Sequence, residues 1–270
     1  MARVLSVVNQ KGGVGKTTTA VNLAAALAAA ERPTLLIDLD PQGNATAGVL
    51  PDRLGIPAPS IYEVLLEGAP LEKACRPTAL PFLSLVPGSS DLVGAEVELV
   101  EKAGREGQLR AALAGVLGQY AFVVVDCPPS LGLLTLNALV AADAALIPLQ
   151  CEYYALEGLA QLMKTLDLVR TRANPRLGIE GIVFTMFDGR TSLAVQVRSE
   201  VERFFREHLF QTVVPRNVRL TEAPSHGRPI LQYDLRSAGA VAYLELAKEV
   251  IAHDEARAGA RARGAAPAGG

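Results

Sequence analysis

The chain has 270 residues, of which 50% are hydrophobic and 20% are charged, and it contains no tryptophan. Its formal net charge is −2, so overall charge gives no reason to expect nucleic-acid binding, and any such surface must be local. The length allows one or two domains with a sizeable core. The first apolar run is too short for a signal peptide, and no uncharged run approaches the ~20 residues of a membrane span.

Short β-branched runs alternate with helical patterns along the chain. Strands are predicted at residues 3–8, 34–39, 82–86, 122–126, 144–149, 179–185 and 211–214. Helices are predicted at residues 16–30, 61–67, 92–103, 108–119, 133–142, 156–173, 192–208 and 238–256. This alternation is typical of an α/β fold with a mostly parallel twisted sheet and helices on both faces. We expect a single domain over residues 1–256 and a flexible Ala/Gly/Arg tail over residues 257–270.

A glycine-rich segment, N-Q-K-G-G-V-G-K-T-T, follows the first predicted strand and leads into a helix. The backbone N–H groups of such a loop and the helix N-terminus form an anion site. In the nucleotide-binding pattern, Lys16 reaches the β- and γ-phosphates and the Thr17 hydroxyl binds Mg²⁺. The ordinary pattern has a glycine where this chain has Gln10, and Lys11 is an additional lysine. The flanking strand and helix favour a nucleotide loop over a glycine-rich turn with solvated lysines.

Carboxylates end two of the predicted strands. Asp38 and Asp40 follow an apolar run in L-L-I-D-L-D-P-Q-G-N, and if the strand continues they share one face beside the loop. A carboxylate near Mg²⁺ and the γ-phosphate can orient or deprotonate water. A plain turn is the alternative, because Asp, Pro, Gly and Asn are turn formers, but beside a nucleotide loop we favour function. Asp126 ends V-V-V-D-C-P-P and is expected to hold the water shell of the metal.

Four strings together resemble the chromosomal ParA (Soj) partition ATPases, over about residues 3–251. They are K-G-G-V-G-K-T-T-T, L-L-I-D-L-D-P-Q-G-N-A-T, V-V-V-D-C-P-P-S and V-P-R-N-V-R-L-T-E-A-P-S-H-G-R-P-I. The first string marks the deviant-Walker superfamily, which includes MinD, the nitrogenase iron protein and the arsenite-pump ATPase. The last is far more specific for ParA/Soj.

The resemblance implies a slow, Mg²⁺-dependent ATPase that acts in chromosome or plasmid partition, in the cytoplasm and on the nucleoid. An ATP-bound sandwich homodimer would bind nonspecific double-stranded DNA, and hydrolysis stimulated by a ParB/Spo0J-type protein would release it. The guanine-reading N-K-x-D pattern of GTPases is absent from the sequence, which supports ATP.

The resemblance also implies roles by position. Lys11 is the signature lysine that contacts the partner's nucleotide, and Gly13 lies where two loops face each other, so that a side chain there would block dimerisation. The catalytic set is Lys11, Lys16 and Asp40, and the metal set is Thr17, Asp40 and Asp126. The nucleotide-binding set is Lys11, Gly12, Gly13, Val14, Gly15, Lys16, Thr17, Thr18, Pro215 and Asn217, of which the last two lie against the adenine.

DNA contacts are implied at Arg190 and Arg219, with Arg216 a weaker candidate. The sequence alone does not select them, since residues 188–228 hold seven arginines against five acids. An unpaired surface arginine is usually only solvated, and phosphate binding requires clustered charge.

Three other classes of protein share parts of this pattern. MinD-like membrane binding needs a C-terminal amphipathic helix, but no large apolar residue follows His253. An iron–sulfur reductase needs two cysteines per subunit at the dimer interface. The sequence leaves this class open, because Cys127 and Cys151 could supply them. An amidoligase needs a substrate pocket built from additional sequence. With Cys75 the chain has three cysteines, and they form no C-x-x-C pair. We expect all three to be small buried side chains, as fits a protein of the reducing cytoplasm.

Overall fold

A twisted sheet of eight strands forms the centre of the protein in this computed structural model, which describes residues 2–50 and 59–264. The strand order is β3-β4-β2-β5-β1-β6-β7-β8. The strands are β1 (Arg3–Val7), β2 (Thr34–Asp38), β3 (Arg76–Pro77), β4 (Leu83–Val86), β5 (Phe122–Asp126), β6 (Ala144–Gln150), β7 (Gly178–Phe187) and β8 (Leu209–Pro215). Within this sheet the short edge strand β3 is antiparallel to β4, and the other pairs are parallel. The predicted mostly parallel α/β sheet is therefore confirmed.

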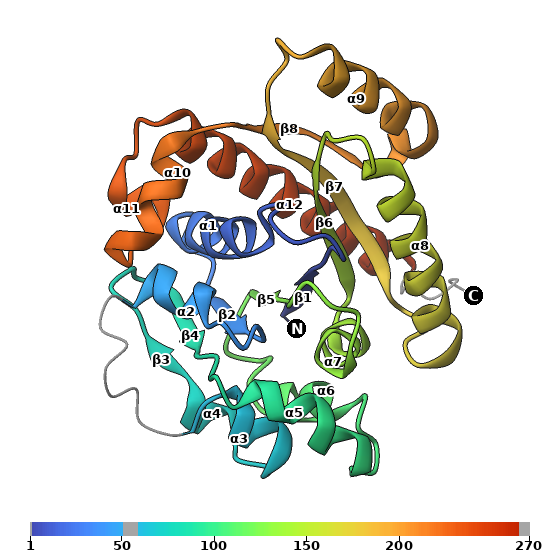
Figure 1. The fold of residues 1–270 in the computed structure, drawn as a ribbon. Coiled ribbons are helices and arrows are strands. Elements are labelled where there is room, and N and C mark those ends of the chain that lie inside the picture. Colours follow the sequence, from blue (N-terminus) through green and yellow to red (C-terminus); the bar gives the residue numbers. More distant parts are fainter. Residues whose placement is uncertain (1, 51–58, 265–270) are drawn as a thin grey trace, which may run out of the picture.

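Helices cover both faces of the sheet (Figure 1). One face carries α1 (Lys16–Ala29), α2 (Asn44–Val49), α10 (Val218–Glu222), α11 (Ile230–Tyr233) and α12 (Ala238–Gly264). The other carries α3 (Ile61–Leu66), α4 (Leu71–Ala74), α5 (Leu92–Glu98), α6 (Gln108–Leu113), α7 (Leu133–Ala141), α8 (Ala155–Arg172) and α9 (Ser192–Phe205).

Each face of the sheet has its own apolar core, because side chains alternate along a strand. In β1, Val4 packs in the core under α7 and α8, whereas Leu5 and Val7 pack in the core under α1 and α12. By the same alternation Asp38 and Asp126 point to the α1 face, and they are register partners on the adjacent strands β2 and β5. The sheet thus brings two carboxylates to the side where the glycine-rich loop begins α1.

The short elements α2, α4, α10, α11 and β3 were not predicted from the sequence. Each has only two to six residues, too few to show a clear period, and helices this short depend on tertiary contacts rather than on propensity. The longer predicted elements lie within three residues of their expected bounds, except that α5 and α6 end five and six residues early and α12 ends late.

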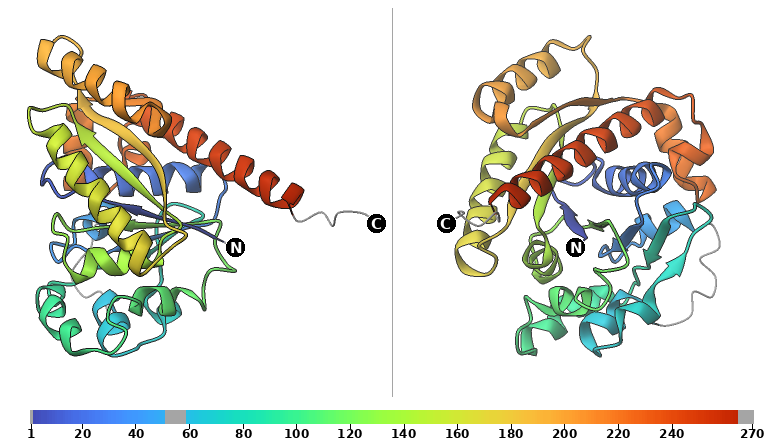
Figure 2. Two further views of the ribbon diagram at one scale, coloured as in Figure 1. Left: turned by 90° about the vertical axis from the view of Figure 1, so that its right-hand side faces the viewer. Right: turned by 180° about the vertical axis from the view of Figure 1, so that it is seen from behind.

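The C-terminal helix differs from the prediction. A flexible tail was expected from Arg257, but α12 continues to Gly264 (Figure 2). Ala and Arg are strong helix formers, so the Ala/Arg-rich composition extends the helix. Arg257 also forms an ion pair with Glu180 of β7, whose side chain is 1% exposed. The rest of the predicted tail, residues 265–270, lies outside the described residues.

Candidate nucleotide site

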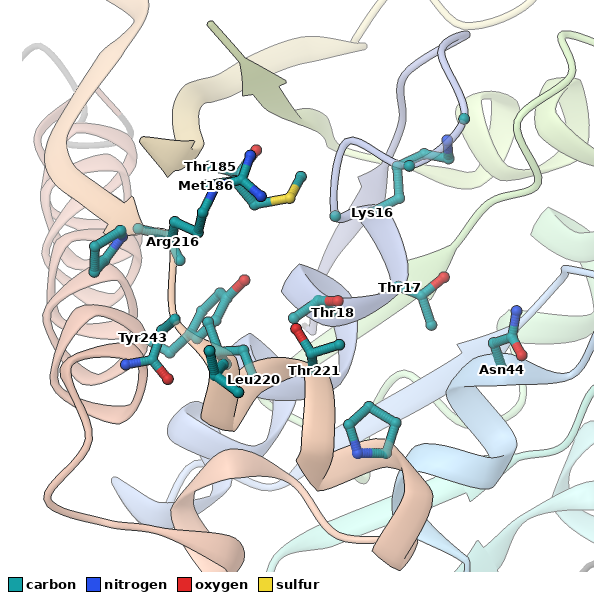
Figure 3. Close-up of a pocket in the computed structure, with 18 of the residues that line it drawn as sticks. Lys16, Thr17, Thr18, Asn44, Thr185, Met186, Arg216, Leu220, Thr221 and Tyr243 are labelled. Atoms are coloured by element: carbon teal, nitrogen blue, oxygen red, sulfur yellow. The ribbon is translucent and has the colours of Figure 1, made fainter. Parts of the chain in front are cut away.

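The glycine-rich loop opens onto a cavity of about 610 Å³. In Figure 3 the first turn of α1 lies on one side of this cavity, and side chains of α10 and α12 lie on the other. The predicted residues that line it are Gly12, Gly13, Gly15, Lys16, Thr17, Thr18, Asp40, Pro215, Arg216 and Asn217. The structure therefore brings together residues that are 200 positions apart in the chain.

The backbone of the loop is shaped by two glycines and two outside anchors. Gly13 and Gly15 have φ angles of +75° and +85°, a left-handed conformation that favours glycine. The side chain of Asn9 accepts the Lys11 N–H at 3.0 Å and donates to the Pro148 carbonyl. The Thr185 hydroxyl of β7 donates to the Val14 carbonyl at 2.8 Å. Val14 is buried behind the loop, so its expected contribution to nucleotide binding is structural.

The two lysines of the loop have different surroundings. Lys16 is buried, and its ammonium group donates to the Lys11 carbonyl at 2.8 Å, across the mouth of the loop. Burial lowers the pKa of Lys16, and the nearby Asp126 carboxylate opposes that shift. The Lys11 side chain is half-buried and forms an ion pair with Glu152, which follows β6. Lys16 therefore lines the cavity and lies against the loop, whereas Lys11 is not among the residues that line the cavity.

Asp126 is the most unusual group of the site. Its side chain is fully buried, and neither carboxylate oxygen has a hydrogen bond of ordinary geometry within the described residues. Burial and the charge of Asp38 raise its pKa well above the usual value, and the neighbouring Thr17 hydroxyl opposes that rise. Buried polar groups are normally paired, so the orphaned oxygens fit a cation with its bound water.

Those oxygens and the Thr17 hydroxyl suit Mg²⁺, which prefers oxygen ligands and keeps several waters. The described residues contain no cluster of three or more His, Cys, Asp or Glu side chains that could hold a metal alone. A Mg²⁺ ion at this position would therefore depend on phosphate oxygens and water for its remaining ligands.

Asp38 and Asp40 do not act as an equivalent pair. The strand ends at Asp38, so the expected common face is not formed. Asp40 lies beyond it, 7% exposed, lines the cavity and accepts the Gln42 N–H at 2.9 Å. Asp38 is fully buried and accepts the Asp40 N–H at 3.1 Å. Only Asp40 is placed to meet a ligand in the cavity.

The far wall of the cavity follows β8. Asn217 caps α10 by accepting the Arg219 N–H at 2.9 Å, and this cap fixes the turn in which Pro215 and Arg216 line the cavity. Arg216, expected as a weaker DNA contact, therefore also borders the nucleotide cavity.

The other two arginines expected to bind DNA already have acidic partners. Arg190, 89% exposed, forms a two-point ion pair with Asp188, whose pKa this contact lowers to about 2. Arg219 pairs with Glu222 at 2.9 Å and Asp234 at 3.5 Å. Exposed pairs of this kind are weak and exchange readily with solvent, so they leave both arginines able to change partners.

The cysteines and helices bear on the other classes of protein. The described cysteines are free, and Cys127 and Cys151 are buried, as expected, while Cys75 is partly exposed. Because Cys127 lies wholly inside the chain, it is poorly placed to bridge two subunits through a metal cluster. Across residues 2–50 and 59–264, no helix is both long and apolar enough to cross a membrane.

Sequence reasoning missed Asn9, Thr185 and Glu152. Asn9 stands directly between the first strand and the glycines, a position that marks it as a loop anchor. Thr185 bonds to a residue 171 positions away, so no local pattern reveals it. Glu152 likewise meets Lys11 only through the fold.

Comparisons with known proteins agree with this fold. A family model described as an AAA domain matches residues 2–179. The chain is 55% identical over 254 residues to the chromosome partitioning protein ParA of Myxococcus xanthus, covering 94% of this chain and 89% of that protein. It is 51% identical over 253 residues to the sporulation initiation inhibitor protein Soj of Bacillus subtilis, covering 94% and 100%.

Among solved structures, cobyrinic acid a,c-diamide synthase from Mycobacterium smegmatis, with bound ADP and magnesium, is similar with a TM-score of 0.82. It is 39% identical in sequence, and the match covers 94% of this chain and 96% of that one. Identity is higher to the partition proteins, at 51–55% over nearly the whole chain. The protein therefore belongs to the ParA/Soj family of chromosome-partitioning proteins.

Proposed function

We propose that this protein is a Mg²⁺-dependent ATPase that acts in chromosome or plasmid partition. The observation that carries the proposal is the buried Asp126 carboxylate, which has no hydrogen bond of ordinary geometry and lies behind Thr17 and Lys16, two residues that line the cavity. A buried carboxylate of this kind suits a bound cation, and the N–H groups of the loop suit a bound anion. Mg²⁺ with a nucleoside triphosphate satisfies both. The related proteins named ParA and Soj support the role in partition.

Different residues of the site would bind the phosphates, the metal, the attacking water and the adenine. Loop N–H groups and Lys16 would bind the phosphates, while Thr17 and Asp126 would hold Mg²⁺, which neutralises phosphate charge. Asp40, at the cavity wall, would orient or deprotonate the attacking water. Pro215 and Asn217 would lie against the adenine.

A second copy of the chain would complete the site. In the single chain Lys11 pairs with Glu152 at the rim, so it contributes nothing to the cavity behind its own loop. In a sandwich homodimer Lys11 would instead reach the partner's γ-phosphate, which couples charge neutralisation to dimer formation. Hydrolysis would remove that phosphate and weaken the dimer.

The dimer would bind nonspecific double-stranded DNA through Arg190 and Arg219, with Arg216 adding to the same surface. Two copies would double the local positive charge, as phosphate binding requires. A ParB/Spo0J-type protein would stimulate hydrolysis and release the dimer, so the protein would work in the cytoplasm on the nucleoid.

Sedimentation velocity with ATP or ADP, with and without DNA, tests the proposal. Wild-type protein is expected to be monomeric with ADP, dimeric with ATP and Mg²⁺, and to move with DNA only in the ATP state. Lys16→Ala should lose nucleotide binding, and Arg219→Ala should keep the ATP dimer but lose DNA. ATP affinity retained by Lys16→Ala would contradict the loop assignment. ATP turnover that ignores DNA but responds to a carboxylic acid would favour an amidoligase instead.

A further inference from the structure

The Asp38 carboxylate holds together three segments next to the proposed catalytic loop. One oxygen accepts the Asp40 N–H at 3.1 Å. The other accepts both the N–H and the hydroxyl of Thr46 in α2, each at 2.7 Å. The side chain is fully buried, so water does not compete for these bonds. Asp38 therefore ties the backbone of Asp40 to the first turn of α2.

Thr46 extends this contact to the segment after β4. Its hydroxyl accepts the Gly88 N–H at 2.9 Å while it donates to Asp38. Gly88 fits closely, because a Cβ atom there would lie 3.0 Å from the Asp38 carboxyl carbon and 3.1 Å from the carbonyl oxygens of Asp38 and Asp40. We call these three residues, Asp38, Thr46 and Gly88, the β2 clamp.

The Asp40 loop needs such a clamp because it lies between two cavities. On one side is the nucleotide cavity, and on the other is a second cavity of about 430 Å³ beside Gly88; Gln42 lines both. Leu39 packs in the core, but beyond Asp40 the exposed Gln42 side chain gives the loop little support. The bond from the Gln42 N–H to Asp40 lies within the loop itself and does not anchor it to the sheet. The bond from the Asp40 N–H to Asp38 does, and it continues the anchoring begun by the Leu39 N–H, which donates to the Asp126 carbonyl at 3.0 Å.

We propose that Asp38, acting through the β2 clamp, is a positioning residue for ATP hydrolysis. Asp38 is the register partner of Asp126 on the neighbouring strand, so the clamp sets the place of Asp40 relative to the metal-holding carboxylate. It supports the loop from behind and touches no substrate. This role rests on the proposed function of Asp40.

Thr46→Val tests the clamp without altering an acid. Valine keeps the shape of threonine and the N–H bond to Asp38, but it removes the hydroxyl bond and leaves the Gly88 N–H without its acceptor. Loss of loop position is expected to lower kcat for ATP hydrolysis about tenfold or more, with KM changed by less than about twofold. Thr46→Ser restores the hydroxyl and is expected to restore kcat.

Gly88→Ala provides a second route to the same result, since it presses on Asp38 and Asp40 without removing a polar group. Unchanged kcat in both Thr46→Val and Gly88→Ala would overturn the proposal. So would a joint loss of kcat, ATP affinity and melting temperature that Thr46→Ser does not repair, because that pattern marks a general structural role. Asp40→Ala run in parallel separates the two proposals: normal hydrolysis there would remove Asp40 from catalysis, whatever the Thr46 variants do.

Discussion

At the scale of single residues, Asp126 is expected to reduce the stability of the free protein and to contribute to the binding of ATP and Mg²⁺. Its carboxyl is fully buried without a hydrogen bond of ordinary geometry among the described residues, and burial raises its pKa. Functional groups of this kind commonly reduce the stability of the free protein. Asp126→Asn is expected to raise the free energy of unfolding of the nucleotide-free protein by roughly 1–3 kcal/mol, and to reduce the stabilisation by ATP and Mg²⁺. Thermal unfolding with and without both ligands measures the two effects.

Asp167→Asn is the matched control, because the Asp167 side chain is 70% exposed on α8 and forms a surface ion pair with Arg170. It should leave both the melting temperature and the protection by ATP and Mg²⁺ close to wild type. An Asp126→Asn variant that melts lower and is protected as strongly as wild type would contradict a metal role for Asp126.

The residues predicted best from the sequence are those that a short local motif identifies by both residue type and position. Lys16 and Thr17 follow the glycines directly, and Asp126 ends an apolar strand, so pattern alone brought them together. Asp38 and Asp40 were harder to separate, because the D-L-D string does not show that Asp38 is buried and accepts hydrogen bonds from Thr46 and Asp40. The string predicts a turn with two acids, but which of the two is buried and hydrogen-bonded depends on tertiary contacts.

At the scale of elements, one buried acid anchors the C-terminal part of α12 to the sheet, beyond the bonds that Glu249 of the same helix accepts from β8. Glu180 of β7 pairs with Arg3 of β1 and with Arg257 of α12, and it also contacts His253. The composition of residues 257–264 predicts a flexible tail, because the segment has low complexity and contains no large apolar side chain. An anchor 77 positions away, which composition cannot show, holds the start of that segment.

Glu180→Ala is expected to destabilise the protein by about 3–5 kcal/mol, because it leaves the 9%-exposed Arg3 side chain without its acidic partner. Urea unfolding measures this loss. Glu245→Ala, which removes an exposed pair with Lys248 on the same helix, should cost less than about 1 kcal/mol. Equal losses in the two variants would show that Glu180 is no anchor.

At the scale of the whole molecule, charge explains why the composition gives no sign of the proposed DNA binding. The net charge is −2, and Arg190 and Arg219 each stand beside their own acids. A single copy therefore offers little excess charge to a phosphate backbone. Binding that depends on two copies would make retention on DNA follow the dimer, not the monomer.

Lys11→Ala tests the dimer more cleanly than a change at Gly13. Gly13 has a φ angle of +75° with open space around its Cβ position, so a side chain there adds backbone strain to any clash between subunits. Lys11 is half-exposed and its ammonium group pairs with the exposed Glu152, so its loss should cost the fold less than about 1 kcal/mol.

Lys11→Ala is expected to bind ATP with near wild-type affinity, since Lys16 and the loop remain, yet to sediment as a monomer with ATP and Mg²⁺. DNA retention and hydrolysis should fall with the dimer, because the lysine that neutralises the γ-phosphate would come from the second copy. Lys73→Ala, an exposed lysine of α4, serves as the control for lost charge and should dimerise normally. An ATP dimer formed by Lys11→Ala as readily as by wild type would mean that each site is complete within one chain.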